Sequence, residues 1–196
     1  MSAFRDLLLI NKGHFALESG LHGDVWFDLE PAFAQPKLLR TFTEGLAALL
    51  SRYEIECVCG ALVGGALFAY SIAEQMGIEF LYSERHVSAA NGYRTVTYRV
   101  PNPLRSAVAN RRIAVVDDVI NAGSAVTKTC DDLRSLGAEP VVLASVLTVG
   151  GEKPKQLEAK YPAVLSLEHL EGSLWSPAEC PLCAAGMRLV DPYGSK

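Results

Sequence analysis

The chain has 196 residues, of which 49% are hydrophobic and 20% are charged. This balance is typical of a folded domain with an apolar core and excludes an intrinsically disordered chain. Lysine and arginine total 18 and aspartate and glutamate total 22, so the net charge of -4 excludes a generally basic nucleic-acid-binding protein.

The longest uncharged segment runs over residues 57–73 and contains Gly60, Gly64 and Gly65. Glycines at these places favour a strand, a loop and a helix over a membrane span. No signal peptide is visible, and the cysteine count of five is odd. We therefore expect a cytoplasmic protein with reduced thiols and no membrane partner.

In chain order, the first half is predicted to hold short elements and two longer helices. Residues 5–11 indicate a short helix, and residues 15–17 and 25–29 indicate strands around a turn at Ser19–Gly20. Apolar residues at helical spacing predict helices over 36–52 and 65–76, the second ending at Gly77. Short strands are expected over 55–59 and 79–82.

The second half continues with strands and one further helix. Residues 93–100 alternate like an exposed strand, and residues 112–116 form a short apolar strand. A helix is expected over 125–136, followed by Gly137. Two more strands are expected over 140–149 and 163–167, the first apolar enough to be buried on both faces. This alternation predicts a parallel sheet flanked by helices, with ligands bound beyond the C-terminal ends of the strands.

The most informative segment covers residues 113–125. Four apolar residues lead to Asp117 and Asp118, and a small-residue turn over 121–124 then opens a helix. Backbone N–H groups at a helix N-terminus favour an anion such as phosphate. Two carboxylates at a strand end accept hydrogen bonds from a sugar diol or hold Mg²⁺ through water.

This segment, Val115-Val-Asp-Asp-Val-Ile-Asn-Ala-Gly-Ser-Ala125, resembles the phosphoribosyl pyrophosphate (PRPP) motif of the type I phosphoribosyltransferases. Residues 13–28, the loop Gly60-Ala-Leu-Val-Gly-Gly65 and the tail over 179–190 are most similar to orotate phosphoribosyltransferases. The tail, with Cys-Pro-Leu-Cys at 180–183, resembles one prokaryotic branch of that family. The resemblance extends over about residues 5–194.

The resemblance implies an α/β type I phosphoribosyltransferase fold with a five-stranded parallel sheet core flanked by helices. A small hood would come from residues of about 1–35 and 160–196, with a mobile loop over 84–112, all within one domain over 1–196. The implied activity is transfer of the 5-phosphoribosyl group from PRPP to orotate with release of pyrophosphate, as in pyrimidine synthesis. Mg²⁺, held mainly through PRPP, would be the cofactor, and the protein would be a homodimer.

The resemblance also implies roles for individual residues. Asp117 and Asp118 would bind the ribose hydroxyls as catalytic groups, and the 5-phosphate would be held by Asn121, Ala122, Gly123, Ser124 and Ala125. Pyrophosphate would be bound by the loop of Leu62, Val63, Gly64 and Gly65, often through a strained or cis peptide, together with Arg85, Arg94 and Arg99. The base would lie against Trp26 and Phe27, although aromatic residues on a short strand are also typical of a core.

Six arginines, at 85, 94, 99, 105, 111 and 112, lie between Glu84 and Arg112. This concentration indicates a loop that closes over a polyanion, with Arg85 as a further catalytic candidate. Arg111 and Arg112 are expected to mark the start of a strand. His86, beside Arg85, is a weaker candidate for a phosphate contact.

Several positions depart from the family pattern. The loop has no lysine, Asn121 stands where the family has threonine, and Glu18 is a poor neighbour for an anionic base. These departures leave two alternatives open: a divergent phosphoribosyltransferase acting on another base, or a non-catalytic relative that senses PRPP or a nucleotide.

Cys180 and Cys183 form one C-x-x-C pair, and zinc needs four ligands. Further ligands would have to come from His169 or from a partner chain, and no metal ligand is assigned with certainty. The other interpretations of the two cysteines are a structural motif of the tail and a redox-active pair.

Overall fold

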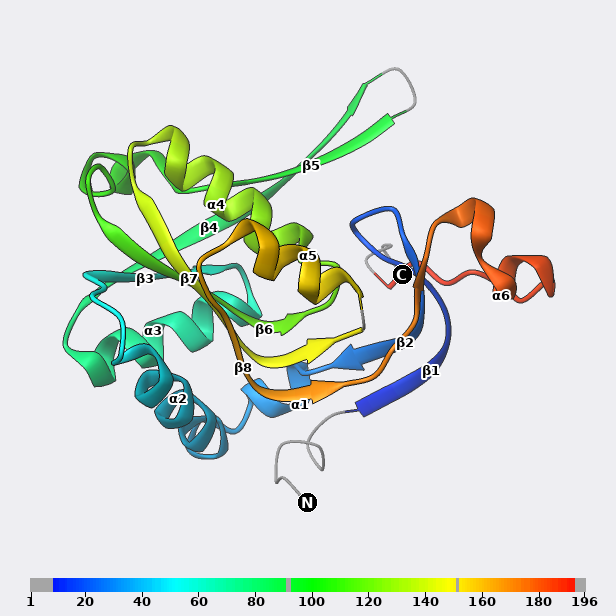
Figure 1. Ribbon diagram of the computed structural model, residues 1–196, viewed down its shortest axis with the longest axis horizontal. Helices are drawn as coiled ribbons and strands as arrows, with labels where there is room; N and C mark the ends of the chain where they lie inside the picture. Colours follow the sequence, from blue (N-terminus) through cyan, green and yellow to red (C-terminus); the bar gives the residue numbers. More distant parts are fainter. Residues whose placement is uncertain (1–8, 91–92, 151, 193–196) are drawn as a thin grey trace.

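The computed structural model describes residues 9–90, 93–150 and 152–192. A six-stranded sheet with the order β5-β4-β3-β6-β7-β8 lies at its centre (Figure 1). The five parallel strands are β4 (Glu79–Ala90), β3 (Cys57–Ala61), β6 (Arg112–Ile120), β7 (Glu139–Val149) and β8 (Val164–Leu170). The antiparallel edge strand β5 (Tyr93–Arg99) pairs with β4. The predicted five-stranded parallel core is confirmed.

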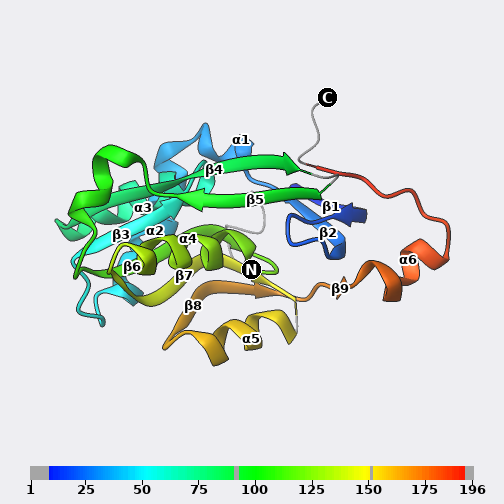
Figure 2. The same ribbon diagram turned by 90° about the horizontal axis from the view of Figure 1, so that it is seen from above.

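Helices cover both faces of the sheet, as Figures 1 and 2 show. α2 (Pro36–Leu50) and α3 (Gly64–Met76) pack on one face, and α4 (Ser124–Ser135) and α5 (Glu152–Lys160) on the other. Every residue of β7 after Glu139 is buried, because both of its faces are covered. A hydrophobic core therefore lies on each face of the sheet. Val142 belongs to the main core, which includes α2 and α3, and Leu143 belongs to the second core, which includes α4 and α5.

A second sheet is built from both ends of the chain. It contains β1 (Leu9–Ala16), β2 (His22–Asp28) and β9 (Leu174–Trp175), all antiparallel to their neighbours. We call this three-stranded sheet the hood sheet. The short helix α6 (Pro181–Ala184) follows β9, and Figure 1 shows it beyond the β1–β2 hairpin. The remaining elements are α1 (Glu30–Phe33), η2 (Asn102–Ala107) and η3 (Pro177–Glu179).

The predicted helix over 5–11 is wrong at its described end, since residues 9–11 belong to β1. Leu9, Ile10 and Asn11 pair with Asp28, Phe27 and Trp26 of β2. Pairing with a partner strand outweighs the weak local preference of so short an apolar run. Residues 1–8 lie outside the described part of the chain.

β6 is four residues longer than predicted, and the extra residues carry the acidic pair. Asp117, Val119 and Ile120 stay in register with Ser145, Leu147 and Thr148 of β7. The helix ends are as predicted, since Gly77 (φ 66°) and Gly137 (φ 83°) both adopt the left-handed conformation. α5 is absent from the sequence-based prediction because its segment is mostly polar.

No helix in the described ranges is long and apolar enough to cross a membrane. Hairpin β4–β5 extends from the main sheet toward the side on which β1 and β2 lie (Figure 2). The hood sheet and this hairpin thus lie near the C-terminal edge of the parallel strands, where ligands of such sheets bind.

Candidate active site

A cavity of about 540 Å³ opens at the C-terminal ends of β3 and β6. Its walls come mainly from three parts of the chain that are far apart in sequence: the β1–β2 hairpin with the residues that follow it, the loop after β3, and the segment from the end of β6 to the start of α4. The predicted site residues that line it are Trp26, Phe27, Leu62, Val63, Gly64, Asp117, Asp118, Asn121, Ala122, Gly123, Ser124 and Ala125. The sequence motifs therefore meet around one space.

Two carboxylates from β6 form one wall of this cavity. The Asp118 N–H donates to Asp117 Oδ1 at 3.1 Å, and the Val119 N–H donates to Asp118 Oδ1 at 2.8 Å. Burial and the adjacent Asp118 carboxylate raise the pKa of Asp117, and burial also raises the pKa of Asp118. A ligand that donates hydrogen bonds or carries a cation would lower the free energy of this pair in its charged form.

The turn after β6 supplies a helix N-terminus. Gly123 has φ 72°, and a Cβ at this position would lie 2.6 Å from Leu157 Cδ1, so both the backbone and the space require glycine here. Ser124 is the first residue of α4. The first N–H groups of a helix have no partner within the helix, so the start of α4 can bind an anion in the cavity.

The loop after β3 supplies a second helix N-terminus. Its Leu62–Val63 peptide bond is cis, and α3 begins at Gly64. A Cβ on Gly64 would collide with Asp118 Oδ2, and one on Gly65 would lie 2.7 Å from Asp117 Oδ1. Glycine thus allows the start of α3 to lie directly against the two carboxylates. Two helix N-termini beside one cavity suit a ligand with two anionic groups.

Glu18, in the turn between β1 and β2, is bonded to several polar groups at the edge of the cavity. Its carboxylate accepts hydrogen bonds from Arg85 Nε at 2.7 Å, Tyr98 Oη at 3.1 Å, Ser124 Oγ at 3.3 Å and Lys128 Nζ at 3.4 Å. We call these five residues the Glu18 cluster. It joins the hood sheet, hairpin β4–β5 and α4.

Opposing effects set the ionisation of Glu18. Burial raises the pKa, but hydrogen bonds from Arg85 and Tyr98 and the charge of Lys128 outweigh it, so the pKa lies below its usual value. The Glu18 side chain is only 5% exposed. Glu18 is therefore a buried, ionised group that neutralises two cations beside the cavity.

Sequence reasoning notes Glu18 only as a poor neighbour for an anionic base, and it misses Tyr98 and Lys128. One signal for Lys128 exists, because it follows Ser124 by four residues on α4 and so shares its helix face. Nothing local predicts the contact of Tyr98 with a turn 80 residues earlier in the chain.

The expected cluster of six arginines does not form a single patch, which corrects the sequence-based interpretation. Three of them pair with acids elsewhere: Arg105 with Asp132, Arg111 with Glu56 and Glu79, and Arg112 with Glu139. Arg111 and Arg112 stand at the start of β6, as predicted, which is the end opposite the cavity.

The other three arginines belong to hairpin β4–β5, and neither Arg85 nor Arg99 is among the described residues that line the cavity. Arg85 is paired with Glu18, and Arg99 is exposed. The side chain of Arg94 lies outside the described residues. His86 is paired with Glu84 at 3.8 Å on the same hairpin.

The two aromatic residues of β2 differ in their surroundings. Phe27 is 8% exposed and belongs to the main core, although it also lines the cavity. Trp26 is half-buried, and its ring lies 6.4 Å from that of Phe15, between centroids. Trp26 therefore has more freedom to contact a ligand.

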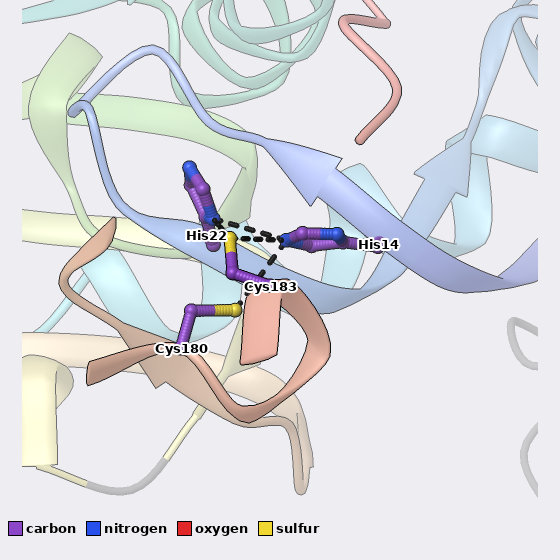
Figure 3. A group of neighbouring side chains, drawn as sticks. All are labelled: His14, His22, Cys180 and Cys183. Carbon is purple, nitrogen blue, oxygen red and sulfur yellow. Dashed lines mark hydrogen bonds between the residues drawn. The ribbon is translucent and has the colours of Figure 1, made fainter. Parts of the chain in front are cut away.

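The tail cysteines do not meet His169, the candidate ligand expected from the sequence. Cys180 and Cys183 instead lie beside His14 and His22 of the β1–β2 hairpin (Figure 3). The other cysteines, Cys57, Cys59 and Cys130, are buried in the second core, and burial raises the pKa of each thiol.

Comparison with known proteins identifies a family. Residues 34–179 match the family model described as "Phosphoribosyl transferase domain". A curated relative from Caldanaerobacter subterraneus subsp. tengcongensis, named orotate phosphoribosyltransferase, is 31% identical over 196 residues, which cover 100% of this chain and 96% of the relative. A protein of the same name from Thermoanaerobacter sp. is 30% identical with the same coverage.

Solved structures share the fold. The crystal structure of orotate phosphoribosyltransferase from Aeropyrum pernix aligns with a TM-score of 0.64 and 21% identity, covering 85% of this chain and 90% of that one. The crystal structure of APRTase from Giardia lamblia, complexed with 9-deazaadenine, aligns with a TM-score of 0.67 and 12% identity, covering 85% of this chain and 95% of that one. Structural likeness alone therefore does not distinguish the bases on which these proteins act.

Proposed function

We propose that orotate is the base accepted by this chain, which belongs to the phosphoribosyltransferase family and is an enzyme of that class. The proposed reaction transfers the 5-phosphoribosyl group from PRPP to a ring nitrogen of orotate and releases pyrophosphate. The observation that carries the phosphoribosyl transfer is one cavity that joins the Asp117–Asp118 pair, two helix N-termini and an aromatic wall.

PRPP suits the cavity because its charges and hydroxyls match the surrounding groups. We propose that the start of α4, from Asn121 to Ala125, binds the 5-phosphate through backbone N–H groups. The ribose hydroxyls would donate to Asp117 and Asp118. Pyrophosphate would lie against the start of α3 at Leu62–Gly65, where the helix dipole favours an anion.

The same carboxylates fit a divalent cation. Asp117 and Asp118 offer closely spaced oxygen donors, and burial raises the pKa of both in the absence of a cation. Such oxygen donors suit Mg²⁺, which usually binds through one or two carboxylates, water and substrate phosphates. Bound with PRPP, Mg²⁺ would supply positive charge to the leaving pyrophosphate.

In the proposed step, the bond between the anomeric carbon and the pyrophosphate oxygen breaks as a bond from the base nitrogen to that carbon forms. Positive charge develops on the ribose and negative charge on pyrophosphate. The carboxylates of Asp117 and Asp118 would stabilise the positive charge on the ribose, and the N-terminus of α3 would stabilise the negative charge on pyrophosphate. The protein itself would orient the reactants and stabilise the developing charges. Arg85 would bind the leaving pyrophosphate after exchanging its ion pair with Glu18 for one with pyrophosphate.

Orotate is supported by the names of the full-length relatives, and Trp26 offers a face on which a base can stack. Glu18 favours a second candidate, a neutral base with N–H donors, because its carboxylate lines the same cavity. We propose a homodimeric, cytoplasmic, single-domain protein on the strength of the family resemblance alone.

The test is pyrophosphate release from PRPP and Mg²⁺ with orotate, followed by uracil, adenine, guanine and hypoxanthine. Release that depends on orotate, with orotidine 5′-phosphate as product, is the expected result. Release only with a neutral base would replace orotate by that base and keep the phosphoribosyl transfer. Absence of release with every base, in protein shown to be folded, would contradict the proposed reaction.

A further inference from the structure

We propose that His14, His22, Cys180 and Cys183 bind a structural zinc ion that fastens the C-terminal tail to the hood sheet. One potential ligand atom from each residue takes part, and all four atoms lie within 4.8 Å of one another. Figure 3 shows the two imidazoles and two thiols converging on one space from β1, β2 and the α6 segment. This group is separate from the cavity at the end of the parallel sheet.

Four spacings between these atoms are close to the edges of a zinc tetrahedron. His14 Nε2 lies 3.0 Å from His22 Nδ1 and 3.4 Å from Cys180 Sγ. Cys183 Sγ lies 3.3 Å from His22 Nδ1 and 3.6 Å from His14 Nε2. With zinc bonds of about 2.0–2.1 Å to nitrogen and about 2.3 Å to sulfur, a tetrahedral site needs roughly 3.3 Å between nitrogens and roughly 3.6 Å between nitrogen and sulfur.

The hydrogen bond on the other side of His14 orients its ring for metal binding. His14 Nδ1 lies 2.9 Å from the carbonyl oxygen of Met187. Because a carbonyl only accepts, Nδ1 carries the proton and donates, which leaves the Nε2 lone pair facing the thiols. Metal-binding histidines commonly have such an outer hydrogen bond, which sets both tautomer and ring orientation.

The fold aims the two histidines at the same place. The pairing of β1 with β2 shifts by one residue between Lys12 and Phe15, so His14 lies at a bulge. Bulges commonly re-aim a side chain, and this one allows His14 and His22 to approach from adjacent strands. Both rings are buried, at 2% and 7% exposure.

The tail reaches the histidines between two backbone attachments. Before α6, Trp175 of β9 pairs with His22. After α6, the Val190 N–H donates to the His14 carbonyl, and the Ala16 N–H donates to the Val190 carbonyl, both at 2.8 Å. The tail segment between these attachments carries Cys180 and Cys183. A metal bound to them would close this loop onto the two strands that hold the histidines.

The donor set favours zinc over other metals and a structural role over a catalytic one. Two cysteines and two histidines are a common structural zinc set, whereas Mg²⁺ and Ca²⁺ prefer oxygen ligands. Four protein ligands leave no position for a substrate. The tail continues to Pro192, which lines the cavity. Zinc binding would therefore hold the hood sheet and one part of the cavity wall in place.

The test uses the full chain, purified without chelator and analysed for metal content. We expect one zinc per chain, reduced to background in Cys183→Ser and in His14→Ala. His169→Ala is the matched control and should keep its zinc, because His169 lies outside the group. All proteins are checked for folding by circular dichroism, so that zinc loss and unfolding are distinguished.

Replacement by Co²⁺ in the unaltered chain gives a second readout that needs no variant. Tetrahedral cobalt with two thiolates has intense visible bands and a near-ultraviolet thiolate charge-transfer band, and zinc should abolish both. The proposal is overturned if the folded chain binds no zinc, if zinc remains in the Cys183→Ser protein, or if alkylation and mass analysis find Cys180 and Cys183 joined as a disulfide. None of these outcomes depends on the base that the enzyme accepts.

Discussion

Glu18 and Arg85 lie 67 residues apart in the chain, and their side chains form an ion pair with 2.7 Å between Oε2 and Nε. The pair joins the turn of the hood sheet to the strand that leads into hairpin β4–β5. Lys128 of α4 contacts the other carboxylate oxygen at 3.4 Å. One buried acid thus connects the three elements that border the cavity beyond the β3 and β6 ends.

Glu18→Gln should lower the free energy of unfolding at neutral pH by about 1–3 kcal/mol, because it removes a buried partner of two cations. The pKa of Glu18 is lowered in the folded state, so its contribution is present above the pKa of the unfolded chain and is lost as pH falls through the folded-state value. Urea unfolding from pH 7 down to about pH 3 should show the difference from the unaltered protein shrinking.

The matched control for this change is Glu44→Gln. Glu44 pairs with Arg40 on the surface of α2, where both side chains are more than half exposed. An exposed pair of this kind contributes about 0.3–0.5 kcal/mol. Equal losses in the two variants would contradict the buried role of the Glu18 cluster.

Asp117→Asn should stabilise the protein and abolish PRPP binding. Burial and the Asp118 charge raise the pKa of Asp117 in the folded state. The resulting destabilisation is absent below the unfolded-state pKa and fully present once pH exceeds the folded-state value, so stability falls as pH rises across that window. Each kcal/mol regained by the amide raises Tm by about 2–4 °C.

Calorimetry measures both effects, by thermal unfolding for stability and by titration with PRPP and Mg²⁺ for binding. Asp131→Asn on α4 is the control, since Asp131 is exposed and pairs with Arg134 and Lys160. A higher Tm with unchanged PRPP affinity would show that Asp117 does not bind the ribose, although its burial beside Asp118 destabilises the protein.

Gly64→Ala should weaken PRPP binding by tenfold or more, a loss of about 1.4 kcal/mol. The added Cβ would collide with Asp118 Oδ2 and lie 2.9 Å from Phe33 Cζ, so the carboxylate or the start of α3 must move. Gly23→Ala, where a Cβ would meet neighbours at 3.5 Å or more, is the control. Unchanged PRPP affinity in folded Gly64→Ala protein would exclude a tight fit between loop and carboxylate.

Trp26→Ala should raise KM for the base roughly tenfold and leave KM for PRPP nearly unchanged, because Trp26 borders only the hood side of the cavity. A stacked aromatic contact contributes about 0.5–1.5 kcal/mol beyond the area it buries. Trp26→Phe should restore most of the base affinity. Steady-state kinetics with each substrate varied in turn separates the two constants, and an increase confined to PRPP would contradict the assignment.

Phe27→Ala tests the other aromatic residue for a different role. Phe27 packs in the main core, so the substitution should cost about 3–5 kcal/mol of stability through the cavity it leaves. Urea unfolding measures the loss. A loss of stability below 1 kcal/mol, together with weaker binding of the base, would show that Phe27 contacts the base and contributes little to the core.

The site residues that the sequence analysis groups together are contiguous in the chain. Asp117, Asp118 and the turn to Ser124 lie within one strand–turn–helix unit, whose geometry follows from local apolar patterning and small residues. The loop before α3 is predicted for the same reason. Parallel strands then bring both units to one edge of the sheet, as the alternation of strands and helices implies.

Sequence by itself determined the family, the parallel core and the residues at its C-terminal edge, because each depends on neighbours in the chain. Only the tertiary structure decided which charges meet. Glu18 contacts Arg85, Tyr98 and Lys128 through the path of the hood sheet, whereas Arg111 and Arg112 pair with acids at the far edge.

The group of His14, His22, Cys180 and Cys183 likewise depends partly on local sequence and partly on the tertiary structure. The C-x-x-C spacing is visible in the sequence, but its partner histidines depend on a β-bulge, a strand register and the return of the tail to β1. Contacts between Cys183 and His14, separated by 169 positions, have no local signature. They arise because backbone hydrogen bonds between distant strands align the segments that carry them.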